Sequence, residues 1–353
     1  MAQAWYATRE QVKAALDVAE TARNNSQVDR AIASASRSIE AQTHRKFYPF
    51  DGTRYFGFRP WRDASSSWRM WTNGDEIVSV SSLVVGGDTI SSSDYFLEPV
   101  NSGPPYASVE MDLSSNSVFQ SDETWQRAVA VTGTFGFWDE QEAVGSLTDT
   151  LAADVTDTAN ITWTDPRLVG VGTILKVDSE RLIVTERSFV DSTQNTTGAL
   201  TASNADVSVS VVNSSAFFVG ETIRVDSERM LVVDIGTSTT LTVKRAWDGS
   251  VLAAHSSSAD VYGLTGIEVA RAQLGSTLAA HTSSDVVYRY VVPSGVNDLC
   301  VAEALAQLEQ DKSAWGRNSG AGESEMSGFG RGLFGLRKAV YAEYGRKART
   351  RAI

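Results

Sequence analysis

The sequence lacks the residues from which disulfides, thiolate metal clusters and membrane spans are built. Its 353 residues include one cysteine, Cys300, and three histidines, which excludes an internal disulfide and a zinc site made of several thiolates. Apolar runs are far shorter than the roughly 20 residues of a membrane-spanning helix, and the N-terminus lacks the basic-then-apolar order of a signal peptide. We therefore expect a protein made and kept in a cytosol, with no membrane partner, no metal and no cofactor.

Positive charge is scarce over most of the chain and is concentrated at its C-terminal end. The net charge of the whole chain is −12. Residues 326–353 hold seven Lys or Arg against one acid, Glu343, a net charge of +6, so residues 1–325 carry a net charge of −18. Glycines between positions 316 and 335 precede and interrupt this basic, aromatic-bearing segment. Such a segment cannot build a core alone but can order on a partner, so we interpret it as a docking arm behind a hinge.

Both ends of the chain carry helical patterns. Thr8, with Gln11 three residues later, forms the signature of a capping box at the start of a helix over 8–20. A second amphipathic helix is predicted over 27–43, and the helical period resumes at Val296. The apolar stripe of a final helix consists of Leu333, Leu336, Val340 and Tyr344.

Between these ends the apolar pattern changes to a period of two, which indicates strands. We interpret residues 47–138 as a small antiparallel sheet packed on the helices. Its last segment, 128–137, ends in an alternation of glycine and aromatic residues that is typical of a sheet edge or corner.

Internal repeats mark the middle of the chain. Residues 171–184 return 48 positions later as 219–232, and residues 245–261 return 26 positions later as 271–287. Self-similarity of this kind predicts duplicated supersecondary units. Each copy of the first repeat places Asp-Ser-Glu between two alternating segments, where Asp and Ser favour a tight turn.

These patterns together predict an α+β fold. A helical hairpin and C-terminal helices pack with a small antiparallel sheet, and an all-β insertion of one or two small barrels or sandwiches interrupts them. The expected boundaries are a core over 1–143, the inserted repeat domain over 144–292, and a returning helix with the basic tail over 293–353.

The histidines are the residues nearest to a catalytic pattern. His255 and His281 occupy matching repeat positions, each near serines and an acid (Asp260 and Asp285), which is the composition of a nucleophile, a base and an orienting group. A residue that recurs at the same offset in each copy of a β unit usually serves the fold of that unit. We therefore favour a structural role over catalysis.

Other candidate residues also favour structural interpretations. The segment Asp178-Ser179-Glu180 offers oxygens to calcium but lacks the ligand spacing of a calcium loop, so a turn is favoured. Cys300 lies in an apolar helical pattern and is predicted to be a buried thiol. Trp61, Trp68 and Trp71 are expected to fill the layer between sheet and helices or a subunit interface, rather than to stack on bases or sugars.

The order of the parts is more informative than any single motif. A capped helix pair that begins at Thr8 and ends in residues 43–49 is followed by an aromatic sheet that closes with residues 131–136, and a helix returns at Val296. This order resembles the head-tail connector, or adaptor, proteins of long-tailed double-stranded DNA phages. The resemblance covers roughly residues 1–138 and 293–353.

Two further segments resemble phage proteins. Residues 315–347 look like versions of the connector tail from phages of actinobacteria, and residues 223–261 are similar to a small β module that recurs in phage virion proteins. The insertion of that module departs from the compact connector pattern, and outward decoration is its simplest expected role.

The resemblance implies a structural, non-enzymatic virion protein of the neck, at the head-tail interface, made in the host cytoplasm. It implies a homo-oligomeric ring, generally of twelve copies, seated beneath the portal protein. The next head-completion or tail-terminator protein binds the opposite side, and packaged double-stranded DNA passes through non-specifically. The major capsid protein is a further candidate partner.

On this basis the C-terminal segment binds portal carboxylates through its cations and buries apolar area through its aromatic and aliphatic side chains. The expected portal-docking residues are Arg331, Phe334, Leu336, Arg337, Lys338, Tyr341, Tyr344, Arg346, Lys347, Arg349 and Arg351. The acids expected to face the DNA conduit are Glu10, Asp17, Glu20, Asp29 and Glu40.

Two other function classes stay open at the level of sequence. One is a virion module that binds host-surface carbohydrate or decorates the neck, with residues 144–292 as the binding part. The other is an enzyme, such as a hydrolase that uses His255 or His281.

Overall fold

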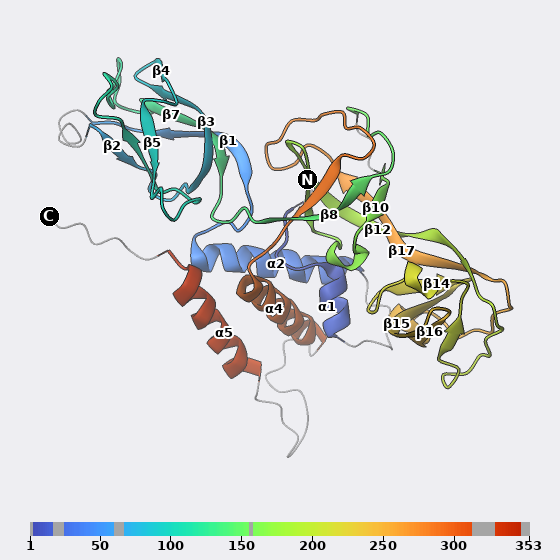
Figure 1. Ribbon diagram of the computed structural model, residues 1–353. Coiled ribbons are helices and arrows are strands. Elements are labelled where there is room, and N and C mark those ends of the chain that lie inside the picture. The colour runs from blue at the N-terminus through green and yellow to red at the C-terminus, as the bar shows by residue number, and fades with distance from the viewer. Residues whose placement is uncertain (1–2, 17–24, 60–66, 155–157, 313–328, 347–353) are drawn as a thin grey trace.

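The computed structural model describes residues 3–16, 25–59, 67–154, 158–312 and 329–346. Within these residues, helices gather below and between two separate groups of strands (Figure 1). The helices are α1 (Arg9–Ala15), α2 (Asn25–Thr43), α4 (Ser294–Lys312) and α5 (Phe329–Tyr344). No helix in the described part of the chain is long and apolar enough to cross a membrane.

The helices lie close to where the sequence patterns place them. The capping box is confirmed: the Gln11 amide donates to Thr8 Oγ1 at 3.2 Å, and the Thr8 amide donates to Gln11 Oε1 at 2.9 Å. The helices predicted over 27–43 and from Val296 are confirmed as α2 and α4. The first predicted helix extends beyond Leu16, where residues 17–20 lie outside the described residues.

Residues 50–135 form two small antiparallel sheets. One has the order β1-β7-β3-β4 and the other the order β2-β6-β5. Their strands are β1 (Phe50–Phe56), β2 (Arg69–Trp71), β3 (Ile77–Val85), β4 (Asp88–Ile90), β5 (Tyr95–Glu98), β6 (Ser108–Met111) and β7 (Val129–Phe135). Leu83 and Val131 from the first sheet share one core with Val109 and Met111 from the second. The two sheets therefore bury their apolar faces against each other.

Residues 141–290 form a single antiparallel sheet of eleven strands. Its order is β10-β8-β18-β11-β12-β17-β14-β15-β16-β13, and β9 pairs with β17 off this path. The strands are β8 (Gln141–Leu147), β9 (Thr158–Ala159), β10 (Ile161–Trp163), β11 (Ile174–Val177), β12 (Glu180–Asn195), β13 (Ser208–Ser210), β14 (Thr222–Val225), β15 (Glu228–Thr237), β16 (Thr240–Lys244), β17 (Asp260–Ala270) and β18 (Val286–Tyr290).

The large sheet encloses two separate hydrophobic cores, which define two β modules. The first β module is built around Val144, Leu147, Leu175, Val177, Leu182, Val184, Val269 and Val287. The second β module is built around Val209, Ile223, Val225, Met230, Val232, Leu241, Val243 and Val261. The long strands β12 and β17 pair from Ile183 and Ala270 to Asn195 and Asp260, so they run through both modules.

The duplication predicted from the sequence is confirmed in the backbone. The hairpins β11–β12 and β14–β15 close with equivalent pairs, Val177 with Glu180 and Val225 with Glu228. The residues that follow β11 and β14 are aspartates with φ of 51° and 50°. Both turns therefore use the left-handed conformation that Asp tolerates better than most residues.

The expected fold class is wrong. The structure has 37% strand against 22% helix, and its largest sheet has 11 strands, so a helical hairpin does not dominate it. The physical reason is that the apolar faces of the small sheets and of the helices pack on other partners than expected. Because the small sheets cover each other, the helices pack instead on the first β module, where Ile174, Ile183 and Tyr290 join the same core as Val28 and Leu299.

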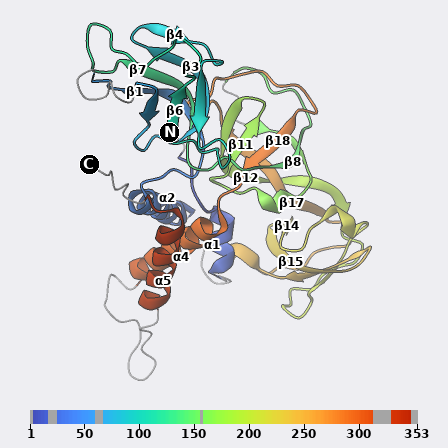
Figure 2. The same ribbon diagram turned by 60° about the vertical axis from the view of Figure 1, so that its left-hand side comes forward.

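The middle region is tied to the rest of the chain at two matching loops. The Leu274 carbonyl, in the loop after β17, accepts a hydrogen bond from the Asp51 amide at 2.8 Å. The next residue, Gly275 (φ +81°), lies against the Asp51 carbonyl, and a Cβ at this position would be 2.2 Å from that oxygen. The equivalent loop of the second module, η4 (Trp247–Gly249), reaches α1 through an ion pair between Lys13 and Asp248 at 2.9 Å. Figure 2 shows the small sheets and the second module on different sides of the helices.

Candidate functional site

Helix α5 carries the described part of the expected docking arm, and its two long faces differ. Val340 is buried, and Leu333, Leu336 and Tyr344 pack against the helical core, as the apolar stripe predicted. The opposite face exposes 68% of Phe334 and 50% of Tyr341, with Lys338 exposed between them. Residues 334, 338 and 341 follow helical spacing, so they form one aromatic and basic stripe, which we call the outer stripe of α5.

Several residues expected to bind the portal form contacts within this chain. Arg337 Nε donates to Glu303 Oε1 at 2.7 Å, and the Glu303 side chain is only 5% exposed. The ring of Tyr344 lies edge-on to Phe47, with ring centroids 5.6 Å apart. These contacts hold α5 on α4 and on the segment that follows α2.

The end of the helix is fixed in the same way. The backbone amide of Arg346 donates to the Thr43 carbonyl at 3.1 Å, and its guanidinium contacts the Gly74 carbonyl and lies 3.5 Å from Glu76. Arg45 donates to the Tyr344 carbonyl at 2.6 Å. The side chain of Arg331 and the residues Lys347, Arg349 and Arg351 lie outside the described part of the structure.

Three of the five acids expected to face a DNA conduit have partners within the subunit. Glu10 accepts from the Val171 amide at 2.9 Å, and Asp29 binds Arg9 at 2.8 Å. Glu40 accepts from the Tyr6 hydroxyl at 2.8 Å. Asp17 and Glu20 lie outside the described residues. Tyr6 is fully buried beside Glu40, and burial, followed by the charge of Glu40, raises the Tyr6 pKa.

A second exposed apolar surface lies on the outer side of the β2-β6-β5 sheet. Phe96 is 52% exposed, Trp71 is 38% exposed, and the Arg69 guanidinium lies 5.1 Å from the Trp71 ring centroid. The expectation that Trp68 and Trp71 fill a layer between sheet and helices is wrong, because both belong to this exposed surface. The expectation of a subunit interface stays a prediction, and Trp61 lies outside the described residues.

The repeated histidines belong to two equivalent buried ionic clusters. In the second module, the Glu228 carboxylate accepts from Arg245 at 2.7 and 2.8 Å, from His255 Nε2 at 2.9 Å and from the amides of Ala246 and Ala253. The other ring nitrogen of His255 lies 2.7 Å from Asp226. Both ring nitrogens are therefore occupied by carboxylates.

The first module repeats this arrangement. Glu180 accepts from Arg271 at 2.8 Å through both oxygens and from His281 at 2.9 Å, and His281 Nδ1 lies 3.1 Å from Asp178. Burial would raise the pKa of Glu180 and Glu228, but the hydrogen bonds from arginine, histidine and backbone amides outweigh it and hold each pKa at about 2. The clusters join the turn after one strand to the loop after another, which is a structural role.

Two remaining candidates are accounted for by their surroundings. Asp178, His281 and Asp285 place possible ligand atoms within 4.8 Å of one another, but Asp285 already accepts from the Thr282 amide and hydroxyl. Cys300 is fully buried, as predicted, and burial raises the pKa of its thiol to about 11. A thiol with such a pKa is protonated at neutral pH and is a poor nucleophile.

No protein-family model matches the chain, and neither a curated protein nor a solved structure is significantly similar to it. The functional argument therefore rests on the residues and their geometry.

Proposed function

We propose that this chain is a structural subunit of the head-tail connector of a long-tailed double-stranded DNA phage, which binds the portal protein and forms a ring with further copies of itself. The observation that carries the proposal is the outer stripe of α5. One face of this helix is fixed to the body, while Phe334, Lys338 and Tyr341 are presented to solvent. Aromatic residues beside a cation are typical of protein interfaces.

The placement of α5 supports this role. It packs on α4 and α2, so helices from both ends of the chain share one core. A helix held in this way presents its outer stripe in a fixed orientation, which lowers the entropic cost of binding. In the sequence, the residues that follow position 346 include the further basic side chains Lys347, Arg349 and Arg351.

A ring subunit also needs a surface for its neighbours, and the exposed surface of Trp71, Phe96 and Arg69 supplies one candidate. It lies on the small sheets, away from α5 (Figure 1). Head-to-tail contacts in a closed ring require two different surfaces on each subunit, and this surface would supply one of them. The net charge of −12 suits a conduit past which DNA phosphates move without adhering.

The proposal is tested by mixing the full chain with the portal protein encoded by the same genome and imaging the mixture by negative-stain electron microscopy. We expect ring-shaped particles with the chain bound to one end of the portal. The double substitution Phe334→Ser and Tyr341→Ser should weaken portal binding at least about tenfold in a sedimentation assay, because it removes both exposed anchors.

Val251→Ser is the matched control, since Val251 is 79% exposed but lies on the second β module. It should bind portal like the unchanged protein. The connector proposal is wrong if the unchanged chain neither binds portal nor assembles. The assignment to the outer stripe alone is wrong if the double variant binds as tightly as the control.

A further inference from the structure

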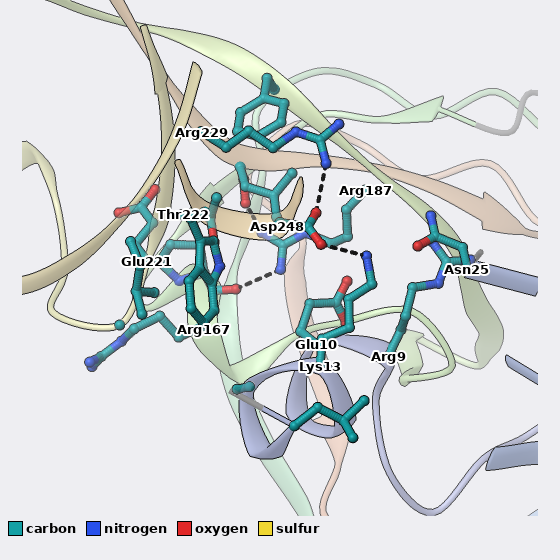
Figure 3. A pocket seen from close by; sticks show the side chains of 18 of the residues that line it. Arg9, Glu10, Lys13, Asn25, Arg167, Arg187, Glu221, Thr222, Arg229 and Asp248 are labelled. Carbon is teal, nitrogen blue, oxygen red and sulfur yellow. Dashed lines mark hydrogen bonds and ion pairs between the residues drawn. The ribbon is translucent and has the colours of Figure 1, made fainter. Parts of the chain in front are cut away.

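A cavity of about 220 Å³ lies where α1 meets the two β modules (Figure 3). Its walls come from α1, the start of α2, β12, β14, β15, β17, η4 and the 3₁₀ turn η2 (Pro166–Leu168). The charged residues that line it are Arg9, Lys13, Arg167, Arg187 and Arg229, and Glu10, Glu186, Glu221 and Asp248.

Most of these charges neutralise one another. Asp248 accepts from Lys13 at 2.9 Å and from Arg229 at 2.6 Å, and Figure 3 shows it between these two side chains. Arg9 binds Glu186 at 2.7 Å as well as Asp29 outside the cavity. The side chains of Lys13 and Asp248 are 24% and 28% exposed, so this rim is in contact with solvent.

Arg187 is different, because among the described residues it forms no ion pair. Its guanidinium donates to the backbone carbonyls of Pro166 at 3.1 Å, Val169 and Leu264, and its Nε is buried without a hydrogen-bond partner. Burial lowers the pKa of Arg187 from its usual value, with Glu10 and Glu221 opposing this. A buried cation without a carboxylate in direct contact is costly, so this group favours an anion beside it.

Glu221, like Glu10, forms no ion pair among the described residues, and it is the more deeply buried of these two acids. It is 5% exposed, and its Oε2 accepts from the Phe218 amide at 3.1 Å. Burial raises its pKa to about 7. The charged groups that act on it from neighbouring elements are Arg187 on β12 and Asp165 and Arg167 around η2.

The duplicated module shows that neither residue is needed for the module fold. At the position of Glu221 the first module has Thr173, whose hydroxyl accepts the equivalent hydrogen bond from Gly170 at 3.1 Å. At the position of Arg187 the second module has Ile235, on a strand with the same irregularity in its pairing. Both unpaired charges are thus departures from the repeat, and both line one cavity.

We propose that this cavity is a binding site for a small oxyanion, such as sulfate or inorganic phosphate, held by Arg187 and controlled by the charge on Glu221. The anion supplies the directly bonded negative charge that Arg187 lacks and accepts from its free Nε. The cations of the rim favour its entry. Ionised Glu221 opposes binding because it adds negative charge to the same wall, whereas neutral Glu221 does not.

The test uses sulfate as the probe, because its charge is the same at pH 6 and pH 8. Isothermal titration of the full chain with sodium sulfate, against sodium chloride of equal ionic strength, should show binding about tenfold tighter at pH 6. That factor follows from a carboxyl with a pKa of about 7, which is mostly neutral at pH 6 and mostly ionised at pH 8. Absence of sulfate binding at both pH values overturns the proposal.

Three variants take the residue of the sister module. Arg187→Ile should abolish sulfate binding, and Glu221→Thr should bind sulfate equally at both pH values. Arg224→Lys is the control, since Lys176 occupies the position of Arg224 in the first module. Like Arg187, Arg224 has a buried Nε without a hydrogen-bond partner, but its guanidinium stacks on the Tyr262 ring at 4.5 Å and does not line the cavity. The Arg224→Lys variant should bind sulfate like the unchanged chain.

Sulfate binding by Arg187→Ile at unchanged affinity would overturn the proposal. If circular dichroism shows that Arg187→Ile does not fold, the pH profile of Glu221→Thr decides. Loss of the tenfold pH dependence in that variant supports the site, and its persistence shows that another group controls binding.

Discussion

The two β modules share their turns and their buried clusters, but they differ where they face the rest of the chain. Glu180 and Glu228 accept matching sets of hydrogen bonds from an arginine, a histidine and two backbone amides. By contrast, Glu221 in the second module replaces Thr173 of the first module on a cavity wall. Asp248 in η4 replaces Leu274 in the loop after β17. The cluster residues that both copies keep serve the shared fold, whereas Glu221 and Asp248 serve the surroundings of one copy.

The arginine after each Asp-Ser-Glu turn is the same residue in both modules but has different contacts in each. In the first module Arg181 binds Asp51 of β1 at 2.6 Å, and its side chain is 7% exposed. In the second module Arg229 binds Asp248 of η4, which belongs to the same module, and the Arg229 side chain is 42% exposed. The first module is therefore joined to the small sheets by a buried contact, and the second is joined to α1 by a solvated one.

The largest effect is expected from breaking what the modules share. Glu180→Gln and Glu228→Gln should each lower the free energy of unfolding by about 3–5 kcal/mol, because each leaves a buried arginine without its counter-charge. Urea denaturation at pH 7 measures the loss. Glu186→Gln is the control, since its side chain is 46% exposed, and it should cost under about 1 kcal/mol. Equal losses for buried and exposed variants would refute the shared role.

The next largest effect is on the pH dependence of stability, to which Glu221 of the second module contributes and Thr173 of the first module does not. Because Glu221 has a pKa of about 7 in the folded chain, above its ordinary 4.5, its contribution to stability is complete below pH 4.5 and is lost as pH rises through 7. The loss approaches about 3 kcal/mol, because each unit of pKa shift corresponds to about 1.4 kcal/mol. Glu180 and Glu228 act in the opposite direction: their pKa of about 2 makes stability fall as pH drops from 4.5 towards 2.

Urea denaturation from pH 8 down to about pH 2.5 measures both changes. Glu221→Thr should remove the decline above pH 4.5 while leaving the acid-side loss intact, since Thr173 fills the same place in the first module. A variant whose profile still declines as steeply as that of the unchanged chain would assign the effect to another group.

Much of the local structure was predictable from the sequence, because local patterns determine it. The capping box at Thr8 needs only two side chains three residues apart, and the hairpin turns need only Asp and Ser between alternating segments. The inward stripe of α5 was also predictable from spacing alone. Burial of Cys300 follows in the same way from its place in an apolar helical pattern.

The pairing of distant faces was not predictable. Ile174 and Ile183 lie in ordinary alternating segments, and nothing local indicates that the helices cover them. Residues 128–137 were expected at an edge or corner, but β7 lies between β1 and β3, where a Cβ on Gly133 would meet the Ser79 carbonyl at 2.1 Å. The glycine there reflects close strand approach. The cavity was missed too, although comparison of the repeats shows Glu221 against Thr173 in the sequence itself.

A smaller effect should come from the buried docking contact of the first module. Arg181→Met keeps the side chain volume but removes the hydrogen bonds to Asp51 and to the Tyr290 hydroxyl. We expect a loss of about 1.5–3 kcal/mol in the free energy of unfolding, because the bonds involve a charged group and the arginine is buried. Chemical denaturation measures it, and a loss under 0.5 kcal/mol, on the order of a surface substitution, would contradict the assignment.

The smallest effect is expected at the equivalent position of the second module. Arg229→Met removes an ion pair to Asp248, but Asp248 keeps Lys13 at 2.9 Å, and both arginine and aspartate are partly solvated. The loss should therefore be under about 1 kcal/mol. Because the two substitutions are chemically identical, their difference measures how differently the two modules are joined to the chain. Equal losses would mean that burial at Arg181 contributes nothing and that the two contacts are equivalent.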